Sequence, residues 1–148
     1  MPRIERTARI VWEGNAARGS GTLTAGSGAF EELGFSLPTR IGAPEGKTSP
    51  EELLAAAHGG CIAMSLANEL SKAGTPPGRL DVGCRIVMDE VEGQGHQIVA
   101  SFVEFAVTAE GLDEDGLGEA VTEADAGCPF SQLLARAGVD VHVSARLA

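Results

Sequence analysis

One stretch decides the fold of this 148-residue chain: residues 48–72, TSPEELLAAAHGGCIAMSLANELSK. Ser49 is a good helix cap and Pro50 suits the first helical position, while the two glutamates that follow place negative charge at the positive end of the helix dipole. Residues 53–72 are apolar on nearly every face of the predicted helix. Because helices that are apolar all round are buried ones, the stretch predicts a buried helix.

Segments with alternating or β-branched patterns on both sides of this helix predict strands. The expected strands are residues 6–14, 19–26, 80–90, 98–110 and 139–145, and the further expected helices are residues 113–126 and 128–137. Residues 35–47, rich in glycine and proline, are interpreted as a long connection of the kind that often carries function. The chain contains no internal repeat, so we expect one α+β domain over residues 1–148.

The composition excludes several classes of function. Acidic residues outnumber basic ones 21 to 11, which gives a net charge of −10 and argues against nucleic acid as a partner. No apolar run approaches the roughly 20 residues that a membrane helix requires, so no membrane partner is expected. Residues 1–6 lack the apolar stretch of a signal peptide, and we therefore expect a cytoplasmic protein.

The three cysteines differ in their local surroundings. Cys84 lies on the apolar face of the strand predicted over residues 80–90, where a free cysteine behaves as a small hydrophobic residue, so we interpret it as part of the core. Cys128 precedes Pro129 at a predicted helix start, where unpaired N–H groups stabilise a thiolate. A connecting cysteine without chemistry is an equally good interpretation of Cys128.

Cys61 lies some three turns inside the central helix, too deep to feel that helix's dipole, and its position alone favours a core residue. Two details weaken that interpretation. Gly59 and Gly60 directly precede it, although each glycine costs roughly 1 kcal/mol relative to alanine in a helix. This cost is reasonable if another backbone or a substrate approaches closely there. His58 also lies on the same face, three residues before the cysteine.

The pair His58 and Cys61 raises the question of a metal or a hydrolase. The three histidines are scattered and no Cys-x-x-Cys motif exists, whereas zinc needs three or four convergent ligands, so no metal cofactor is expected. A cysteine hydrolase needs a histidine base near the thiol. His58 is available for that role, but no hydrolase motif accompanies it.

The combined motifs resemble the osmotically inducible protein C / organic hydroperoxide resistance family over almost the whole chain. The resemblance rests on residues 48–61 (TSPEELLAAAHGGC), 126–131 (AGCPFS), 12–14 (WEG), 18–22 (RGSGT) and 34–40 (GFSLPTR). The last of these resembles the osmotically inducible branch. Where the family has a pair of small residues, usually alanines, before its first cysteine, this chain has two glycines.

The resemblance implies an α+β fold in which an antiparallel sheet packs around a buried central helix, and an intertwined homodimer. It also implies that Cys61 attacks a peroxide and that Cys128 resolves the product. The family pattern places an arginine beside the first cysteine, which matches Arg40, with Glu51 holding the guanidinium. Arg18 is the rival, because the hydroperoxide-resistance branch takes its arginine from the first hairpin.

A positive charge at ~4 Å and an effective dielectric of about 20 is worth about 4 kcal/mol, or roughly three pKa units. Arg40 at that distance would leave Cys61 largely thiolate at neutral pH, less whatever burial and Glu51 take back. Glu51 cannot touch Cys61 directly in a continuous helix, because ten residues span about 15 Å. An arginine must therefore lie between Glu51 and Cys61, or a second subunit must contribute a residue to the site.

The resemblance implies a thiol-dependent peroxidase that acts without a cofactor in defence against oxidative or osmotic stress. Its expected substrates are organic hydroperoxides, with hydrogen peroxide as a further candidate. An external dithiol reduces the resulting disulfide between Cys61 and Cys128, and the hydroperoxide-resistance branch suggests a lipoyl-type donor. Two other classes stay open. One is a redox-sensing or ligand-binding protein that uses the same cysteine pair as a switch, and the other is a structural dimerisation domain.

Overall fold

The helix expected around Cys61 is present as α2 (Pro50–Lys72) in the computed structural model, which describes residues 2–148. The chain divides after Pro50 into two units, each of which is described by itself. Within α2, burial follows one stripe of residues: His58, Gly59, Ile62, Leu66 and Leu70. The expectation of burial on every face is not met in the single chain, because Met64 on another face is 71% exposed.

The first unit is a three-stranded antiparallel sheet followed by a short helix. Its elements are β1 (Ala8–Glu13), β2 (Ser20–Ala25), β3 (Leu33–Phe35) and α1 (Leu37–Ile41). The strands expected over residues 6–14 and 19–26 are therefore present, and they pair as an antiparallel hairpin. The expected long connection over residues 35–47 is wrong in part, because Ser36 caps α1 and Pro38 lies in the first turn of this helix.

A glycine explains how this sheet accommodates two aromatic rings. Gly21 pairs with both Trp12 and Phe35 across the three strands. A side chain at Gly21 would collide with both rings, because its Cβ would lie 2.4 Å from an atom of Phe35 and 2.8 Å from one of Trp12. The two rings pack with their centroids 5.5 Å apart.

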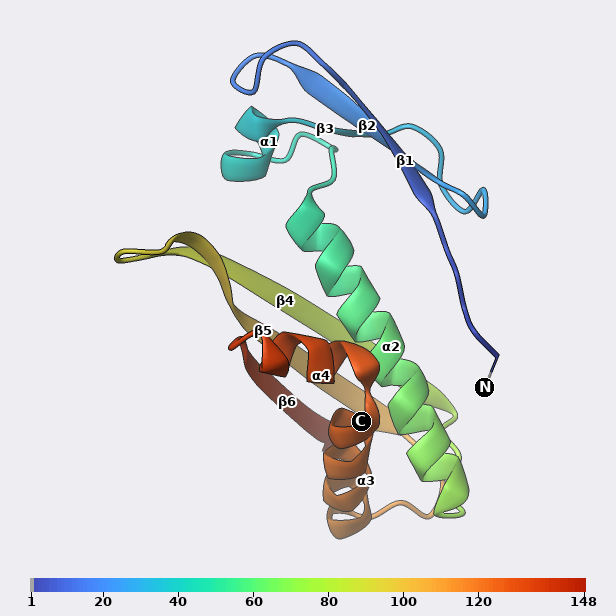
Figure 1. The fold of residues 1–148 in the computed structure, drawn as a ribbon. Coiled ribbons are helices and arrows are strands. Elements are labelled where there is room, and N and C mark those ends of the chain that lie inside the picture. Colours follow the sequence, from blue (N-terminus) through green and yellow to red (C-terminus); the bar gives the residue numbers. More distant parts are fainter. Residues whose placement is uncertain (1) are drawn as a thin grey trace. The chain divides into compact units, whose positions relative to one another are not determined.

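The second unit is a three-stranded sheet with helices on one face (Figure 1). Its further elements are β4 (Arg79–Val91), β5 (Gly95–Thr108), α3 (Glu114–Gly127), α4 (Pro129–Arg136) and β6 (Asp140–Leu147). The predicted elements are thus all found, with ends that differ by a few residues. The strand order is β4-β5-β6, so the long β5 is central.

The expected antiparallel sheet needs a correction in this unit. Strand β4 pairs antiparallel with β5 through a tight hairpin, but β6 pairs parallel with β5. Parallel neighbours require a crossover connection of a dozen or more residues. Here α3 and α4 provide that crossover, and they return the chain to the same end of the sheet.

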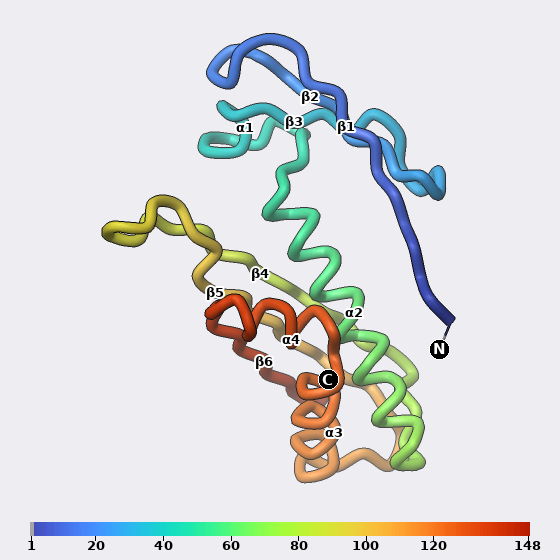
Figure 2. Tube along the Cα trace, in the orientation of Figure 1, coloured from blue at the N-terminus to red at the C-terminus, as the bar shows by residue number. Residues whose placement is uncertain are grey.

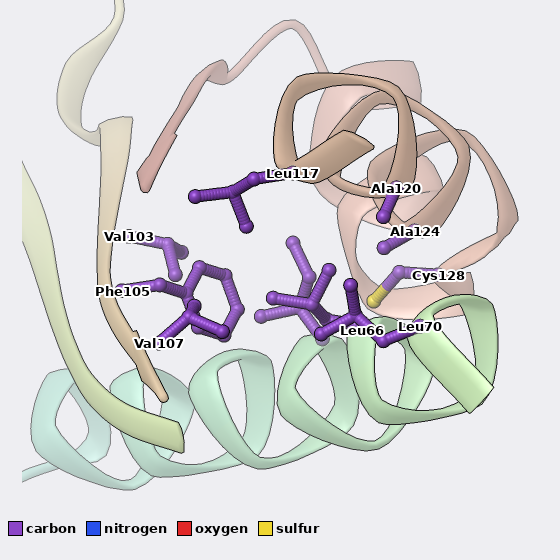
Figure 3. Close-up of a cluster of buried hydrophobic side chains, with 10 residues drawn as sticks. Leu66, Leu70, Val103, Phe105, Val107, Leu117, Ala120, Ala124 and Cys128 are labelled. Atoms are coloured by element: carbon purple, nitrogen blue, oxygen red, sulfur yellow. The ribbon is translucent and has the colours of Figure 1, made fainter. Parts of the chain in front are cut away.

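The hydrophobic core lies between β5 and the helices (Figure 3). Its buried members are Val103, Phe105 and Val107 of β5, Ile62, Leu66 and Leu70 of α2, Leu117, Ala120 and Ala124 of α3, and Cys128. Alternate residues of β5 point toward the helices, as the two-residue period of a strand requires. The core therefore holds α2, α3 and the α3–α4 corner in fixed positions against one sheet face.

Across residues 2–148, every helix falls short of the combination of length and apolarity needed to cross a membrane.

Candidate functional site

Two of the cysteines meet within the second unit. Cys61 comes from the middle of α2, and Cys128 lies at the sharp corner between α3 and α4, which can be followed along the trace in Figure 2. Cys61 packs against the buried cluster that contains Cys128, and the neighbouring Cys128 raises the pKa of Cys61. Both are free thiols. Cys61 is partly exposed, whereas Cys128 is completely buried, with its sulfur directed into the core (Figure 3).

The N-terminus of α4 interacts with the sulfurs of both Cys61 and Cys128. Cys128 is the N-cap of this helix, and its sulfur accepts a hydrogen bond of 3.5 Å from the backbone N–H of Ser131. The backbone N–H of Phe130, in the same turn, lies beside the sulfur of Cys61 and lowers the pKa of that thiol. These are the unpaired donors that every helix start offers. The sequence prediction of a capping role for Cys128 is therefore confirmed.

The expectation that Cys61 lies too deep to feel the dipole of its own helix does not extend to other helices. Cys61 is indeed deep inside its own helix, but the start of a second helix, α4, lies against it. The Phe130 N–H favours the charged form of the sulfur and lowers the pKa of Cys61. Sequence reasoning missed this donor because it comes from an element far away along the chain.

Other influences within this unit outweigh that donor. Burial raises the pKa of the Cys61 thiol above its ordinary value. The neighbouring Cys128 raises it further, first by favouring the protonated form of the Cys61 thiol and second because two adjacent thiolates would repel each other. The contacts within this unit therefore do not generate the thiolate that the sequence predicted. A low pKa for Cys61 requires an additional positive charge.

The arginines predicted to supply that charge belong to the first unit. Arg40 lies in the last turn of α1 and lines a cavity of about 180 Å³ together with Trp12, Phe35 and Leu37. Arg18 follows the turn between β1 and β2, where its backbone N–H binds the side chain of Asn15. The structure describes the two units separately, so the pairing of either arginine with Cys61 stays a prediction.

Glu51, the fourth predicted site residue, lies in the first turn of α2. The helix is continuous from this turn to Cys61, so the two residues are about 15 Å apart along its axis. This distance agrees with the expectation that Glu51 acts on the sulfur only through an intermediary. Its predicted contact with the arginine is not tested by the structure.

The sequence singled out His58, but it did not predict the burial of this side chain or its hydrogen-bond partners. His58 is fully buried on α2 and both of its ring nitrogens are engaged. Nδ1 lies 2.7 Å from the hydroxyl of Ser101 on β5, and Nε2 lies 2.7 Å from the hydroxyl of Ser131 on α4. Burial lowers the pKa of His58 from 6.5, and the charge of Asp125 opposes this shift.

These contacts leave His58 poorly suited to the two roles that the sequence raised for it. Its two nitrogens bind serine hydroxyls, so neither is directed at Cys61 as the base of a hydrolase. Among residues 2–148, no group of three or more His, Cys, Asp or Glu side chains is arranged to hold a metal ion. The signal available in the sequence was a single histidine within a largely apolar helix, because a polar side chain that is buried there needs hydrogen-bond partners.

Cys84 lies on the other side of this histidine. Its sulfur is 3.6 Å from the hydroxyl of Ser101 and 4.0 Å from Nδ1 of His58. It packs against the core, as predicted, but it also lines a cavity of about 510 Å³ between α2 and β4. A Cβ at Gly59 would lie 3.2 Å from the Cβ of Cys84. Gly59 therefore permits the close approach of helix and strand.

Comparisons with known proteins agree with this architecture. The family model described as OsmC-like protein matches residues 42–144. The chain is 34% identical to peroxiredoxin OsmC of Escherichia coli (strain K12) over 131 residues, which cover 88% of this chain and 90% of that protein. Peroxiredoxin OsmC of Shigella flexneri matches with the same identity and coverage.

Solved structures share the fold. The organic hydroperoxide resistance protein OhrB of Bacillus subtilis superimposes with a TM-score of 0.70 at 24% identity, over 95% of this chain and 98% of that chain. An organic hydroperoxide resistance protein from Elizabethkingia anophelis gives a TM-score of 0.76 at 19% identity, over 100% of both chains. These likenesses establish a common α+β fold.

Proposed function

Because this chain belongs to the OsmC-like protein family, we propose that it is a thiol-dependent peroxidase that reduces organic hydroperoxides. The observation that carries the proposal is the contact between Cys61 and Cys128 at the start of α4. Two thiols in contact can form a disulfide after one of them is oxidised. The name of the Escherichia coli relative, peroxiredoxin OsmC, supports the peroxide as the oxidant.

The different burial of the two sulfurs assigns their roles. The partly exposed Cys61 can be reached by a substrate, so it is the attacking thiol. Cys128 has no exposed surface in the chain, and its nearest reactive partner is the sulfur of Cys61. Cys128 is therefore the resolving thiol, which acts after oxidation has occurred at Cys61.

In the first step the Cys61 thiolate attacks the terminal oxygen of the hydroperoxide. The O–O bond breaks, an S–O bond forms, and the substrate leaves as an alcohol after taking one proton from solvent. Sulfur is oxidised to a sulfenic acid and the peroxide is reduced by two electrons. The Phe130 N–H supports the thiolate before the attack.

In the second step the Cys128 sulfur attacks the sulfur of the sulfenic acid. A disulfide forms and the hydroxyl group leaves as water, together with the proton of the Cys128 thiol. An external dithiol then reduces the disulfide by exchange, returns both thiols and becomes a disulfide itself. We propose a lipoyl-type dithiol as this donor, and no metal or organic cofactor takes part in the cycle.

The activating charge is assigned to Arg40. The pKa of Cys61 is raised by the contacts within its own unit, so a positive charge from elsewhere is needed to produce the thiolate. Arg40 lies beside the apolar surface of Trp12 and Phe35, where an alkyl group could bind. Glu51 orients the guanidinium in this proposal, and Arg18 is the alternative source of the charge.

The surroundings of the site favour an organic hydroperoxide over hydrogen peroxide. Met64, one turn after Cys61, is 71% exposed. Phe130, whose backbone contacts Cys61, adds a partly exposed ring. Exposed apolar side chains close to a reactive thiol gain free energy by covering an alkyl chain.

We propose that the protein is a cytoplasmic homodimer. None of the apolar side chains of residues 2–50 is fully buried, and β1 is exposed along its whole length. A sheet without a covered face is marginally stable in water. The exposed face of β1 and the exposed face of α2 would each become buried if a second copy covered it. Sedimentation equilibrium showing a monomer at micromolar concentration would contradict this assembly.

The redox switch is the second candidate, because it would use the same pair of cysteines. The raised pKa of Cys61 is typical of a thiol that reacts slowly rather than of a fast catalyst. A switch would be oxidised once per chain, whereas an enzyme would consume many equivalents of peroxide in the presence of a dithiol.

The proposal is tested by following the loss of cumene hydroperoxide with dihydrolipoamide as the electron donor. We expect many turnovers per chain, and a loss of two thiols per chain when the donor is left out. Thioredoxin and glutathione serve as comparison donors, and hydrogen peroxide as the comparison oxidant. A single stoichiometric oxidation without turnover would support the switch, and no thiol loss at all would contradict both functions.

A further inference from the structure

The buried imidazole of His58 connects three elements of the second unit. Its Nδ1 is 2.7 Å from the Ser101 hydroxyl on β5, and its Nε2 is 2.7 Å from the Ser131 hydroxyl on α4. All three side chains are buried, with at most 3% of any of them exposed. Both ring nitrogens are therefore satisfied inside the core, where an unmade hydrogen bond is costly.

The bond to Ser131 lies next to the two reactive sulfurs. His58 is one helical turn before Cys61 on α2, and Ser131 is in the first turn of α4, which Cys128 caps. Ser131 makes two contacts: its hydroxyl binds His58, and its backbone N–H donates to the Cys128 sulfur. One side-chain bond thus joins the turn that carries Cys61 to the turn that positions Cys128.

We propose that His58 is a positioning residue for disulfide formation: through Ser131 it holds the start of α4 against α2, so that the Cys128 sulfur faces Cys61. This role rests on the proposed peroxidase cycle and concerns only its second step. Disulfide geometry is specific, with Cα atoms about 5.5–6 Å apart, so a small shift of α4 places the sulfurs out of range.

The neutral imidazole suits this task. A planar ring with one nitrogen on each side reaches β5 and α4 at once, and serine hydroxyls can donate or accept as the tautomer requires. The groups facing it are Cys84 on β4, which approaches Nδ1, and Asp125 on α3, whose charge acts against the effect of burial. Burial keeps the ring uncharged at neutral pH.

The rate of the second step depends on this alignment. Attack of Cys128 on an oxidised Cys61 is an intramolecular reaction, and well-aligned groups gain large effective concentrations. A misplacement of about 1 Å can reduce such a reaction roughly 100-fold. The first step does not use Cys128, so loss of the His58–Ser131 bond should leave it nearly unchanged.

Two serine variants provide a matched comparison. Ser131→Ala and Ser101→Ala each remove one buried hydroxyl that lies 2.7 Å from the same imidazole. Stopped-flow measurements with cumene hydroperoxide separate sulfenic acid formation from disulfide formation. We expect Ser131→Ala to slow disulfide formation at least tenfold, with sulfenic acid formation within twofold of the unmodified protein. Ser101→Ala should slow disulfide formation less than threefold.

Two histidine variants test the ring itself. In Gln the amide nitrogen can take the place of Nε2, whereas in Asn it takes the place of Nδ1. His58→Gln should therefore keep the contact with Ser131 and form the disulfide at a rate close to normal. His58→Asn keeps only the contact with Ser101 and should be as slow as Ser131→Ala. If His58→Asn does not fold, the two serine variants decide the question.

An equilibrium measurement tests the positioning role of His58 independently of the proposed peroxidase activity. The equilibrium between the Cys61–Cys128 disulfide and glutathione reports the effective concentration of the two thiols without any peroxide. Ser131→Ala should lower that effective concentration at least tenfold, and Ser101→Ala should not. Equal effects of the two serine variants in both measurements would overturn the positioning role, even if peroxide turnover is observed. If no peroxide turnover is observed but the effective thiol concentrations of Ser131→Ala and Ser101→Ala differ tenfold, only the proposed peroxidase function is overturned.

Discussion

The backbone N–H of Phe130 lies beside the sulfur of Cys61 and lowers the pKa of that thiol, although the two residues belong to different helices. Phe130 lies in the first turn of α4, where the backbone N–H groups have no partner within the helix. The same turn donates to Cys128 through Ser131. One helix start therefore supports both sulfurs of the proposed redox pair.

Single replacements of the three cysteines should give three different results. Cys61→Ser should abolish peroxide consumption, because the attacking sulfur is gone. Cys128→Ser should allow one oxidation and leave a sulfenic acid that reacts with dimedone, because no resolving thiol remains. Cys84→Ser should change turnover less than threefold. If Cys84→Ser were the only replacement to lose cumene hydroperoxide turnover with dihydrolipoamide, the assignment of Cys84 to the core and of Cys61 and Cys128 to the redox pair would be wrong.

Replacing Arg40 should change the pH dependence of the first step. Burial and Cys128 raise the pKa of Cys61, so the thiolate is scarce at neutral pH unless a positive charge opposes them. We expect Arg40→Gln to move the midpoint of the rate-against-pH curve up by about three units, which corresponds to about 4 kcal/mol. Arg18→Gln is the matched control, and a larger shift in that variant would assign the charge to Arg18.

The stability of the protein should fall as the pH drops below about 6.5, partly because of His58. The pKa of His58 is lowered from 6.5 in the folded chain, so below that pH the unfolded chain binds more protons than the folded one. Urea unfolding between pH 7.5 and 5 measures this loss. His58→Gln cannot titrate and should show a flatter dependence; an unchanged slope would mean that other groups are responsible.

The two glycines before Cys61 should respond differently to alanine. A Cβ at Gly59 would lie 3.2 Å from the Cβ of Cys84 on β4, which has little freedom to move, whereas a Cβ at Gly60 meets nothing within 4 Å. Alanine improves helix stability by about 1 kcal/mol where there is room. Urea unfolding should therefore show Gly60→Ala to be more stable than Gly59→Ala. The reverse order would indicate that something outside this chain contacts Gly60.

The sequence pattern was sufficient to predict the longer helices and strands and part of the site. The capping residues and the apolar run predicted α2, and patterns of alternating or β-branched residues predicted β4 and β5, because side-chain direction repeats every two residues in a strand. Local chemistry predicted Cys128 as a helix cap, since proline follows it directly. The parallel pairing of β6 with β5 was not predictable in the same way, because periodicity carries no strand direction.

The sequence by itself determined which residues could carry chemistry, and the tertiary structure decided which of them meet. The contact of Cys61 with Cys128, the Phe130 donor and the hydroxyls around His58 all come from residues far apart along the chain. Side-chain periodicity states which face a residue occupies, but not what lies against that face. What lies against each face is decided by the packing of α2, α3 and α4 on one side of β5. This packing brings the cysteines and the histidine together.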